Sequence, residues 1–539
     1  MSGMSQPLAE AVLPDPSGVT VDYGNDETPV IPPSQGSLRS RTLRGSAWTI
    51  GGYGVSNVLR IAGNLVLTRL LFPDVFGLMF LVYVFIQGLS MFSDVGIGPA
   101  IVQSHRGDDP KFLRTAWTIQ CFRGFALWLC SCALAWPVSR FYHQPMMAWL
   151  LPVAALNALI MGLESTSTHT LQRHLSLGRL TLVEISGQIV GIFATVCCAA
   201  IDRYHFGPNH PAAVWAIVGG TSCGALTRTI LSHTVLPGIR HRLEWDRESV
   251  KLLFSFGRWI FVSTLLTFLA AQADGLIFGK LIPLNQLGIY RVAAMLALVP
   301  KDLVSKLGAA VVFPAYSRIC VSGGDLKRLF GRVRVPFLIG GAAVVSGLIA
   351  CGPPLIRILY DYRYESAGWM VQFLAVMVWF QILECTNSAA LLARGNVNWM
   401  AAGSASKVAG MLLLIPLGFH MYGFPGALVA LVLSEVVKYI TAAVGIAIRG
   451  LQGFAGDAAF SAAIAAVAGA AIGCQHMVGA ANGHKYRAFA VTAVIAGGIW
   501  AAVALAYWRR ERAGHLSRTA PNAPDGAALT SKQNVISAA

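Results

Sequence analysis

Apolar runs of about 20 residues recur along almost the whole of this chain. A helix rises 1.5 Å per residue, so about 20 apolar residues are needed to cross the roughly 30 Å hydrocarbon layer of a membrane. Of the 539 residues, 55% are hydrophobic and only 12% are charged, whereas soluble domains carry about 25% charged residues. The sequence therefore predicts an all-α polytopic membrane protein. It excludes a soluble enzyme, a disordered chain and a disulfide-stapled secreted domain.

We count fourteen such runs. They cover residues 46–68, 76–98, 115–137, 147–170, 180–201, 212–235, 254–277, 287–312, 335–356, 369–392, 400–419, 424–446, 458–478 and 488–508. The boundary between the eleventh and twelfth is the hardest to place, because residues 418–425 must hold a complete turn. The flanking segments 1–37 and 509–539 are polar and have no apolar core, so we expect two disordered cytoplasmic tails.

Basic residues are distributed unequally between the two sets of loops that these helices define. With the amino terminus placed inside, the cytoplasmic segments hold 24 Lys and Arg residues and the opposite loops hold 8. Because Lys and Arg accumulate on the cytoplasmic side of membrane proteins, both termini are predicted to lie in the cytoplasm. This loop bias accounts for the formal net charge of +16 better than nucleic-acid binding does.

A stretch of the first half of the chain recurs 211 residues later. Leu65–Leu78 reads LVLTRLLFPDVFGL, and Leu276–Ile289 reads LIFGKLIPLNQLGI. The matched pairs include Leu65/Leu276, Leu70/Leu281, Arg69/Lys280, Asp74/Asn285 and Gly77/Gly288. Six helices separate the copies, so both run from inside to outside. We expect a parallel repeat about an axis along the membrane normal, with six-helix lobes in residues 38–238 and 239–450, a central site, and two additional helices in residues 451–508.

Polar residues inside the apolar runs are the candidates to bind substrate. An ionisable residue at the centre of a membrane helix costs about 2.5–3.5 kcal/mol on insertion scales, so each one is presumed functional. The first run carries a polar stripe with helical spacing, formed by Tyr53, Asn57, Arg60 and Asn64. Basic residues within later runs are Arg123, Arg291, Lys301 and Lys306. We expect these eight residues to line one water-filled cavity.

Several of the charged residues have a structural alternative. Arg291 can anchor its helix at the outer interface, and Arg123 fits a structural role as well as a functional one. Arg228 and Lys438 lie near cytoplasmic helix ends, from which long side chains reach water. Glu435 and Lys438 are spaced to pair on one helix.

Acidic residues within the runs form a second candidate set. They are Asp94, Glu164, Asp274 and Glu384. Each can be a coupling site for a proton or cation, or the counter-charge of a basic residue in the cavity. The sequence leaves both interpretations open.

Sequence patterns for nucleotide hydrolysis or metal binding do not accompany these residues. The Walker pattern GxxxxGK[ST] and the zinc pattern HExxH are absent. The ten cysteines form no CxxC pair, and we interpret them as small apolar packing residues. We therefore expect a transporter without catalytic residues, metal ligands or a cofactor.

Two segments resemble the start of the Wzx-type polysaccharide flippases. They are TLRGSAWTIGGYGVSNVLRIAGNLVLTRLLFPDVFGLM (Thr42–Met79) and SDVGIGPAIVQ (Ser93–Gln103). The turn R-L-L-x-P-x-x-F-G and the string SD-x-G-x-G-x-A-x-[IV]-Q carry most of the match. The Wzx family belongs to the multidrug/oligosaccharidyl-lipid/polysaccharide exporter superfamily, whose lipid II flippases also have two extra helices.

The resemblance implies transfer of an undecaprenyl-diphosphate-linked oligosaccharide across the bacterial inner membrane, for exopolysaccharide or O-antigen synthesis. It implies alternating access between two lobes around a cationic cavity, with glycosyltransferases and a polymerase of the same pathway as partners. Arg60 suits a diphosphate, because a guanidinium binds phosphate bidentately. Tyr53, Asn57 and Asn64 would then bind sugar hydroxyls.

Two rival functions have less support from the sequence. A drug/cation antiporter of the same superfamily would favour a cavity of carboxylates and aromatic residues, and the basic residues argue against it. A membrane polysaccharide polymerase would carry a sizeable catalytic loop outside, whereas the predicted outer loops here are short. Genes for glycosyltransferases and a polymerase beside this one would favour the flippase.

Overall fold

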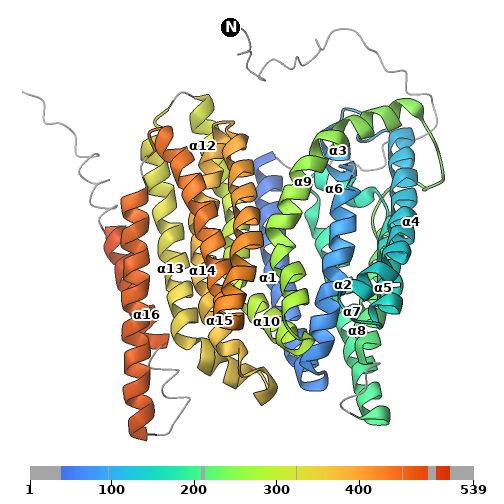
Figure 1. Cartoon of the computed structure of the whole chain (residues 1–539). Coiled ribbons are helices and arrows are strands. Elements are labelled where there is room, and N and C mark those ends of the chain that lie inside the picture. The colour runs from blue at the N-terminus through green and yellow to red at the C-terminus, as the bar shows by residue number, and fades with distance from the viewer. Residues whose placement is uncertain are drawn as a thin grey trace, which may run out of the picture.

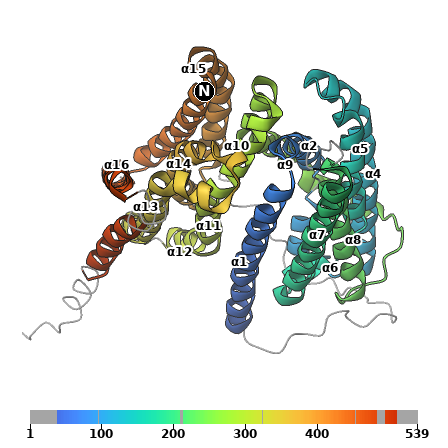
Figure 2. The same ribbon diagram turned by 90° about the horizontal axis from the view of Figure 1, so that it is seen from below.

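The computed structural model describes residues 38–94, 96–207, 213–322, 324–451, 453–482 and 493–509. Within these ranges every regular element is a helix, so the predicted all-α class is confirmed. Figure 1 shows two bundles of helices side by side, with the first half of the chain at the right and the second half at the left. Helices α1, α9 and α10 lie between the two bundles, as the view from below also shows (Figure 2).

The N-terminal lobe contains eight helical segments. They are α1 (Leu38–Leu70), α2 (Pro73–Phe92), α3 (Ile97–Gln103), α4 (Pro110–Phe141), α5 (Met147–Gly162), α6 (Ser167–Arg173), α7 (Leu177–Phe206) and α8 (Val214–Thr234). Helices α2 and α4 both begin with proline, which is favoured at the first helical position because its missing N–H would have no partner there. The Asp109 carboxylate caps α4 by accepting a hydrogen bond from the Lys111 amide at 2.9 Å.

The C-terminal lobe begins within a long helix, α9 (Arg247–Leu281). The elements that follow are α10 (Leu284–Ala297), α11 (Val299–Leu307), the π-helical segment η2 (Gly308–Val312), α12 (Phe313–Val321), α13 (Leu326–Leu359), the short η3 (Tyr362–Tyr364), α14 (Ala367–Ala393), α15 (Val397–Ile448) and α16 (Phe454–Asn482). A last apolar helix covers Ala493–Arg509. It packs on the lobe through Trp500, which donates to the Ser346 hydroxyl.

Within the described residues each of the fourteen predicted spans falls mainly on helical structure, but several do not match one straight helix each. The fourth is broken by 57° between α5 and α6. The eighth is divided into α10, α11 and η2. The eleventh and twelfth form the single element α15, whose backbone reverses at Gly423 (φ 64°, ψ −150°). Among the described residues, eight helices are long and apolar enough to cross a membrane, or nine if the α5–α6 pair is one span. The count of fourteen crossings stays a prediction.

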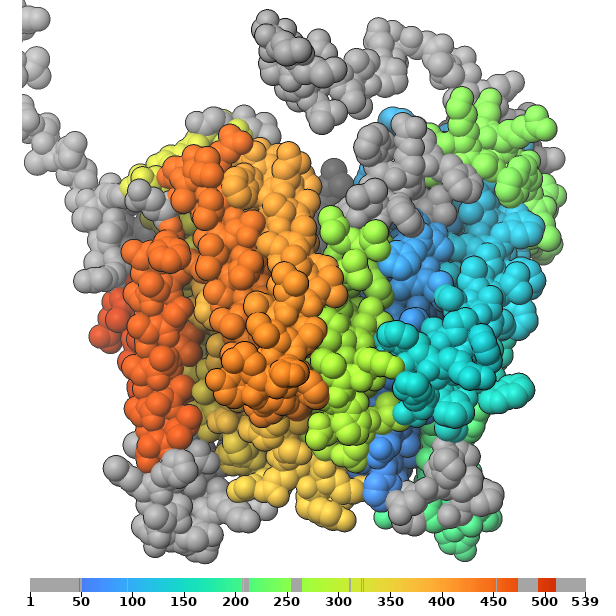
Figure 3. Space-filling model, viewed as in Figure 1, coloured from blue at the N-terminus to red at the C-terminus, as the bar shows by residue number. Residues whose placement is uncertain are grey.

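Contacts between the lobes concentrate at the predicted outer end of the molecule. There the Tyr360 hydroxyl, after α13, donates to Asn64 Oδ1 of α1 at 3.2 Å. The guanidinium of Arg363 donates to the carbonyl oxygens of Thr68 and Arg69 at the end of α1. In the lower part of the space-filling view, the yellow and orange helices, the green segment of α9 and α10 and the blue segment lie side by side without a gap (Figure 3). The two lobes are therefore in contact at the predicted outer end.

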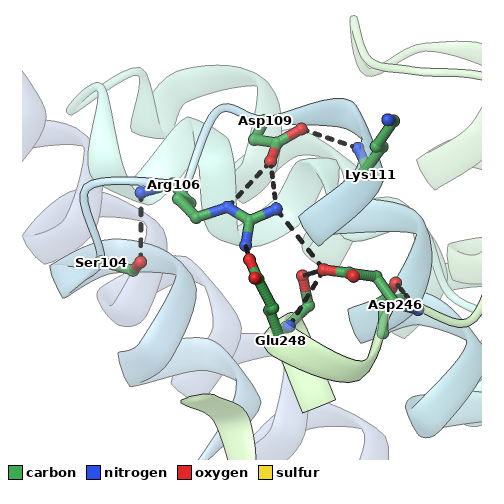
Figure 4. A network of polar contacts seen from close by, with 8 residues as sticks. Ser104, Arg106, Asp109, Lys111, Asp246 and Glu248 are labelled. Carbon is green, nitrogen blue, oxygen red and sulfur yellow. Dashed lines mark hydrogen bonds and ion pairs between the residues drawn. The ribbon is translucent and has the colours of Figure 1, made fainter. Parts of the chain in front are cut away.

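The segment that joins the lobes is attached to the N-terminal lobe. Arg106, in the loop before α4, forms ion pairs with Asp109 at 2.8 Å, Asp246 at 3.5 Å and Glu248 at 3.6 Å (Figure 4). Leu253 packs into an apolar cluster of the N-terminal lobe. Residues 239–253, assigned from sequence to the second lobe, therefore pack on the first lobe.

Candidate functional site

A cavity of about 620 Å³ lies against the C-terminal lobe, where that lobe faces α2. Its walls come from α9, α10, α11, η2, α12, α14 and α15, with Phe80 of α2 at one side. Because these elements are far apart in the sequence, the cavity is a product of the tertiary fold. Four basic and three acidic side chains line it: Arg291, Lys301, Lys407 and Lys438, and Asp274, Glu384 and Glu435.

The polar stripe of α1 faces the C-terminal lobe. Arg60 donates to Asn57 Oδ1 at 2.6 Å, and Asn57 in turn donates to the Tyr53 carbonyl oxygen. Lys306 of α11 places its ammonium 3.7 Å from the centre of the Tyr53 ring. Asn64 accepts the Tyr360 hydrogen bond described above. The structure thus brings the predicted stripe and one predicted lysine together, across the space between the lobes.

Arg291 lies on α10, where that helix packs against α2. Its guanidinium sits 4.9 Å from the centre of the Phe80 ring, and its side chain is exposed to the cavity that it lines. Arg291 is within electrostatic range of Arg60 and of Asp274. Asp274 itself accepts a hydrogen bond from the Tyr290 hydroxyl. Two arginines from different lobes therefore lie within electrostatic range of each other, but Arg60 and the rest of the α1 stripe are not among the residues that line the cavity.

Both predicted lysines of α11, Lys301 and Lys306, lie in the short helix formed by the break in the eighth span. A new helix begins at Val299 with Pro300 in its first turn, and a π-helical segment follows directly after Leu307. Such segments frequently mark functional sites. Lys301 lines the cavity and lies 3.4 Å from the neighbouring Asp302 carboxylate. Asp302 therefore offsets part of the charge that Lys301 brings to the cavity.

Three of the predicted site residues lie away from this cavity. Arg123 of α4 donates to the Ser90 carbonyl oxygen at 2.7 Å and to the Ser93 hydroxyl at 2.9 Å, so it caps the end of α2. Asp94 accepts from the Gly96 amide in the turn after α2. Glu164 lies at the α5–α6 break and pairs with Arg228 at 3.0 Å. None of the three lines the cavity among the described residues.

Sequence reasoning missed Lys407, and it assigned the wrong partner to Lys438. Lys407 and Glu435, both on α15, form a buried ion pair at 2.6 Å. Lys438 pairs with Glu384 of α14 at 3.2 Å. The predicted pairing of Glu435 with Lys438 is therefore wrong, because Glu435 is already held by Lys407. One signal was present, since Lys407 is the only charged residue in the run 400–419.

The string GTSCG at 220–224 matches the Gly-x-Ser-x-Gly pattern of hydrolases. That pattern serves catalysis on a sharp turn between a strand and a helix, whereas here it lies within α8. Methyl groups added at Gly220 and Gly224 would meet the backbone of α7 at Thr195 and Gly187. The glycines let two helices approach closely. Among the described residues there is also no cluster of three or more His, Cys, Asp or Glu able to hold a metal ion.

Comparisons with known proteins agree with this architecture. A family model described as "Polysaccharide biosynthesis protein" matches residues 66–369, more than half of the chain. The lipopolysaccharide biosynthesis protein WzxC of Escherichia coli (strain K12) is 21% identical over 404 residues, which cover 75% of this chain and 80% of WzxC.

Solved structures with a similar fold include the lipid II flippase MurJ in an inward closed conformation. Its TM-score is 0.66 at 13% identity, covering 86% of this chain and 99% of MurJ. An inward-facing multidrug resistance transporter of the MATE family, a member of the MOP superfamily, has a TM-score of 0.57 at 15% identity, covering 75% of this chain and 95% of the transporter. At these identities the likeness establishes the fold.

Proposed function

The chain belongs to the polysaccharide biosynthesis protein family, and from this premise we propose that it is a flippase for a polyprenyl-diphosphate-linked oligosaccharide. It moves the headgroup across the bacterial inner membrane by alternating access between its two lobes, with both termini in the cytoplasm. Similarity to a lipopolysaccharide biosynthesis protein and to a lipid II flippase supports this substrate class. Glycosyltransferases that build the saccharide and a polymerase that consumes it are the partners this function requires.

One observation carries the proposal: three cations meet where the lobes face each other. They are Arg60 of α1, Arg291 of α10 and Lys306 of α11, which we call the cation triad. Among the described residues, none of the three has a carboxylate within ion-pair distance; Arg60 contacts an amide and the other two lie over aromatic rings.

Unneutralised cations within a membrane protein are costly, and an anionic ligand offsets that cost. A diphosphate carries about two negative charges and accepts bidentate hydrogen bonds from guanidinium groups. Because Arg60 belongs to one lobe while Arg291 and Lys306 belong to the other, a single diphosphate contacts both lobes. Substrate binding is thereby linked to the relative position of the lobes.

The charge of the cavity distinguishes this function from the rival antiporter. A cavity for cationic drugs needs an excess of negative charge, whereas basic residues outnumber acidic ones here even before Arg60 and Lys306 are counted. All three lining carboxylates are also engaged: Asp274 by Tyr290, Glu384 by Lys438 and Glu435 by Lys407.

The test is translocation by the full chain in liposomes. A labelled undecaprenyl-diphosphate-linked sugar is added, and its exposure to a membrane-impermeant reagent is followed over time. We expect the wild-type protein to move the lipid, and a variant with all three triad residues replaced by glutamine to fail. Arg357→Gln is the matched control, because Arg357 forms an exposed ion pair with Glu365 at the outer end. Equal rates in wild-type and protein-free liposomes would refute the proposed function.

A further inference from the structure

A second group of charged side chains lines the cavity, separate from the cation triad. It consists of Glu384 on α14 and Lys407, Glu435 and Lys438 on α15, and we call it the charge cluster. The four side chains form two ion pairs, at 2.6 Å for Lys407–Glu435 and 3.2 Å for Lys438–Glu384. The cluster has no net charge, so it does not add to the attraction that the triad exerts on a diphosphate.

The two pairs differ in their access to the cavity. The side chains of Lys407 and Glu435 are 9% and 1% exposed, whereas those of Lys438 and Glu384 are 20% and 13% exposed. Lys407 holds Glu435, which would otherwise compete for Lys438 from one turn away on the same helix. Among the described residues, Glu384 is consequently the carboxylate that pairs with Lys438.

The Lys438–Glu384 contact is suited to exchange. A carboxylate from a ligand would give Lys438 a contact of the same kind as the one it makes with Glu384. Glu384 would not be left without a partner, because the Ser388 hydroxyl donates to its other oxygen at 2.6 Å. After the exchange Glu384 keeps this hydrogen bond but has no counter-charge, so a ligand carboxylate competes with Glu384 for Lys438.

Gln381 supplies an independent indication of what the ligand carries. It lies one turn before Glu384 on the same face of α14 and lines the same cavity. Its buried Oε1 accepts no hydrogen bond within the part of the chain that the structure describes. Buried acceptors are normally satisfied, so this oxygen calls for a donor from the ligand. Sugar hydroxyls are such donors.

We propose that Lys438 and Gln381 form a recognition site for an acidic sugar unit of the transported saccharide. The sugar carboxylate takes the place of Glu384 on Lys438, and a neighbouring hydroxyl donates to Gln381 Oε1. In the absence of such a sugar, Glu384 forms the ion pair with Lys438. This inference rests on the proposed function, since the saccharide reaches the cluster while its diphosphate is held by the cation triad.

The test compares two probes that differ in one group: farnesyl diphosphate linked to glucuronic acid and to glucose. Dissociation constants are measured for the full chain in lipid nanodiscs. We expect the wild type to bind the glucuronyl probe about tenfold more tightly, the effect of one charge-assisted hydrogen bond. Lys438→Gln should lose this preference and keep its affinity for the glucosyl probe, which also shows that it is folded. Lys438→Arg should retain the preference.

Glu384→Gln should change the affinity for the glucuronyl probe in the opposite direction to Lys438→Gln, because it removes the carboxylate that competes for Lys438. It should tighten binding of the glucuronyl probe and leave the glucosyl probe unchanged. Equal binding of the two probes by the wild type, or a preference that survives Lys438→Gln, would overturn the acidic-sugar site alone. If neither probe binds, the proposed function fails, and this inference fails with it.

Discussion

Asn285 donates a hydrogen bond at 3.2 Å to Asp74, the residue at the matching position 211 residues earlier in the chain. Three further matched pairs lie along the same two helices. Methyl groups added at Gly77 and Gly288 would each overlap the other helix, at the carbonyl oxygens of Leu284 and Pro73, which are themselves 211 residues apart. Arg291 stacks over Phe80, again its counterpart.

Residues that contact their own counterparts are those that lie on a two-fold axis. Helices α2 and α10 therefore pack against each other along a pseudo-two-fold axis between the lobes. This packing supports the parallel repeat inferred from the sequence. The axis contact also has an asymmetric element, because an arginine on one side faces a phenylalanine on the other. In the predicted repeat, matched positions form this interface, and the divergence of one matched pair, Phe80 and Arg291, places a cation of the triad beside it.

Gly288→Ala tests the close approach of α2 and α10. The added methyl group would overlap the Pro73 carbonyl oxygen, which is backbone and cannot rotate away. Overpacking of this kind costs typically about 1–3 kcal/mol, so we expect a lower melting temperature in detergent. Gly347→Ala in α13 is the control, since its methyl group would meet nothing within 4 Å and alanine favours helix. A melting temperature for Gly288→Ala at or above that of the control would contradict the axis packing.

Arg60→Ala should abolish polysaccharide export without lowering the amount of protein in the membrane. Arg60→Lys should restore activity only in part, because lysine keeps the charge but loses the planar fork that binds phosphate bidentately. Export is measured by complementation of a strain that lacks the gene, with Arg357→Ala as the control. Full export by Arg60→Ala would assign Arg60 a structural role.

Lys407→Met should destabilise the C-terminal lobe. It leaves Glu435, whose side chain is 1% exposed, as a buried carboxylate without its lysine. Removing one partner of a buried pair typically costs about 3–5 kcal/mol. Lys407→Met/Glu435→Gln should recover most of the loss, since it leaves no unpaired charge. Thermal unfolding of the three proteins decides the matter, and an unchanged melting temperature in the single variant would be incompatible with the pair.

The charge cluster also shows where sequence reasoning stops. An ionisable residue within an apolar run is visible in the sequence, and this criterion found Arg60, Arg291, Lys301 and Glu384. Partners are not visible in the same way. Glu435 and Lys438 have ideal spacing for a pair, but each pairs elsewhere. Glu435 pairs with Lys407, which the turn at Gly423 brings alongside it, and Lys438 pairs with Glu384 of α14.

The sequence left the role of Arg123 open between structure and function, because that role depends on where α2 ends. The sequence predicted that the second span continues to residue 98, which would leave Arg123 beside an uninterrupted helix. In the structure α2 ends at Phe92, and its last carbonyl oxygens need donors. Arg123 donates to one of them, the Ser90 carbonyl oxygen, and also to the Ser93 hydroxyl. The helix end, rather than the apolar pattern, determines what this arginine does.

Acid should destabilise the packing at the break between α5 and α6. His241, in the segment that joins the lobes, accepts a hydrogen bond from the Thr166 amide at 3.2 Å. Burial lowers the pKa of His241 to about 4, and the nearby His233 and Arg114 lower it further in the same direction. In the unfolded state the His241 imidazole is protonated as the pH falls through its ordinary pKa of 6.5, whereas in the folded state it stays neutral to a lower pH. Stability is full above that value and falls as the pH drops toward about 4.

His241→Gln isolates this effect, because its amide oxygen can accept from Thr166 without titrating. Between pH 7 and pH 5 the melting temperature of the wild type should fall further than that of the variant. Parallel losses in the two proteins would show that other groups control the acid response.

Arg363→Ala should open the outer end of the molecule. Arg363 donates to the Thr68 and Arg69 carbonyl oxygens from the C-terminal lobe, and Arg203 of α7 donates to Arg69 from the N-terminal lobe at 3.0 Å. When the lobes part at this end, Arg363 must withdraw, while Arg203 stays with α1 and keeps one of its terminal carbonyls satisfied. Loss of Arg363 therefore removes a contact of the closed state alone and shifts the population toward the outward-open state.

An Asn64→Cys reporter, in a background without accessible native cysteines, should react faster with an impermeant thiol reagent added outside. Arg203→Ala is the matched control, because it removes a contact within one lobe and should leave the reporter protected. Unchanged labelling in Arg363→Ala would mean that Arg363 does not hold the outer end closed.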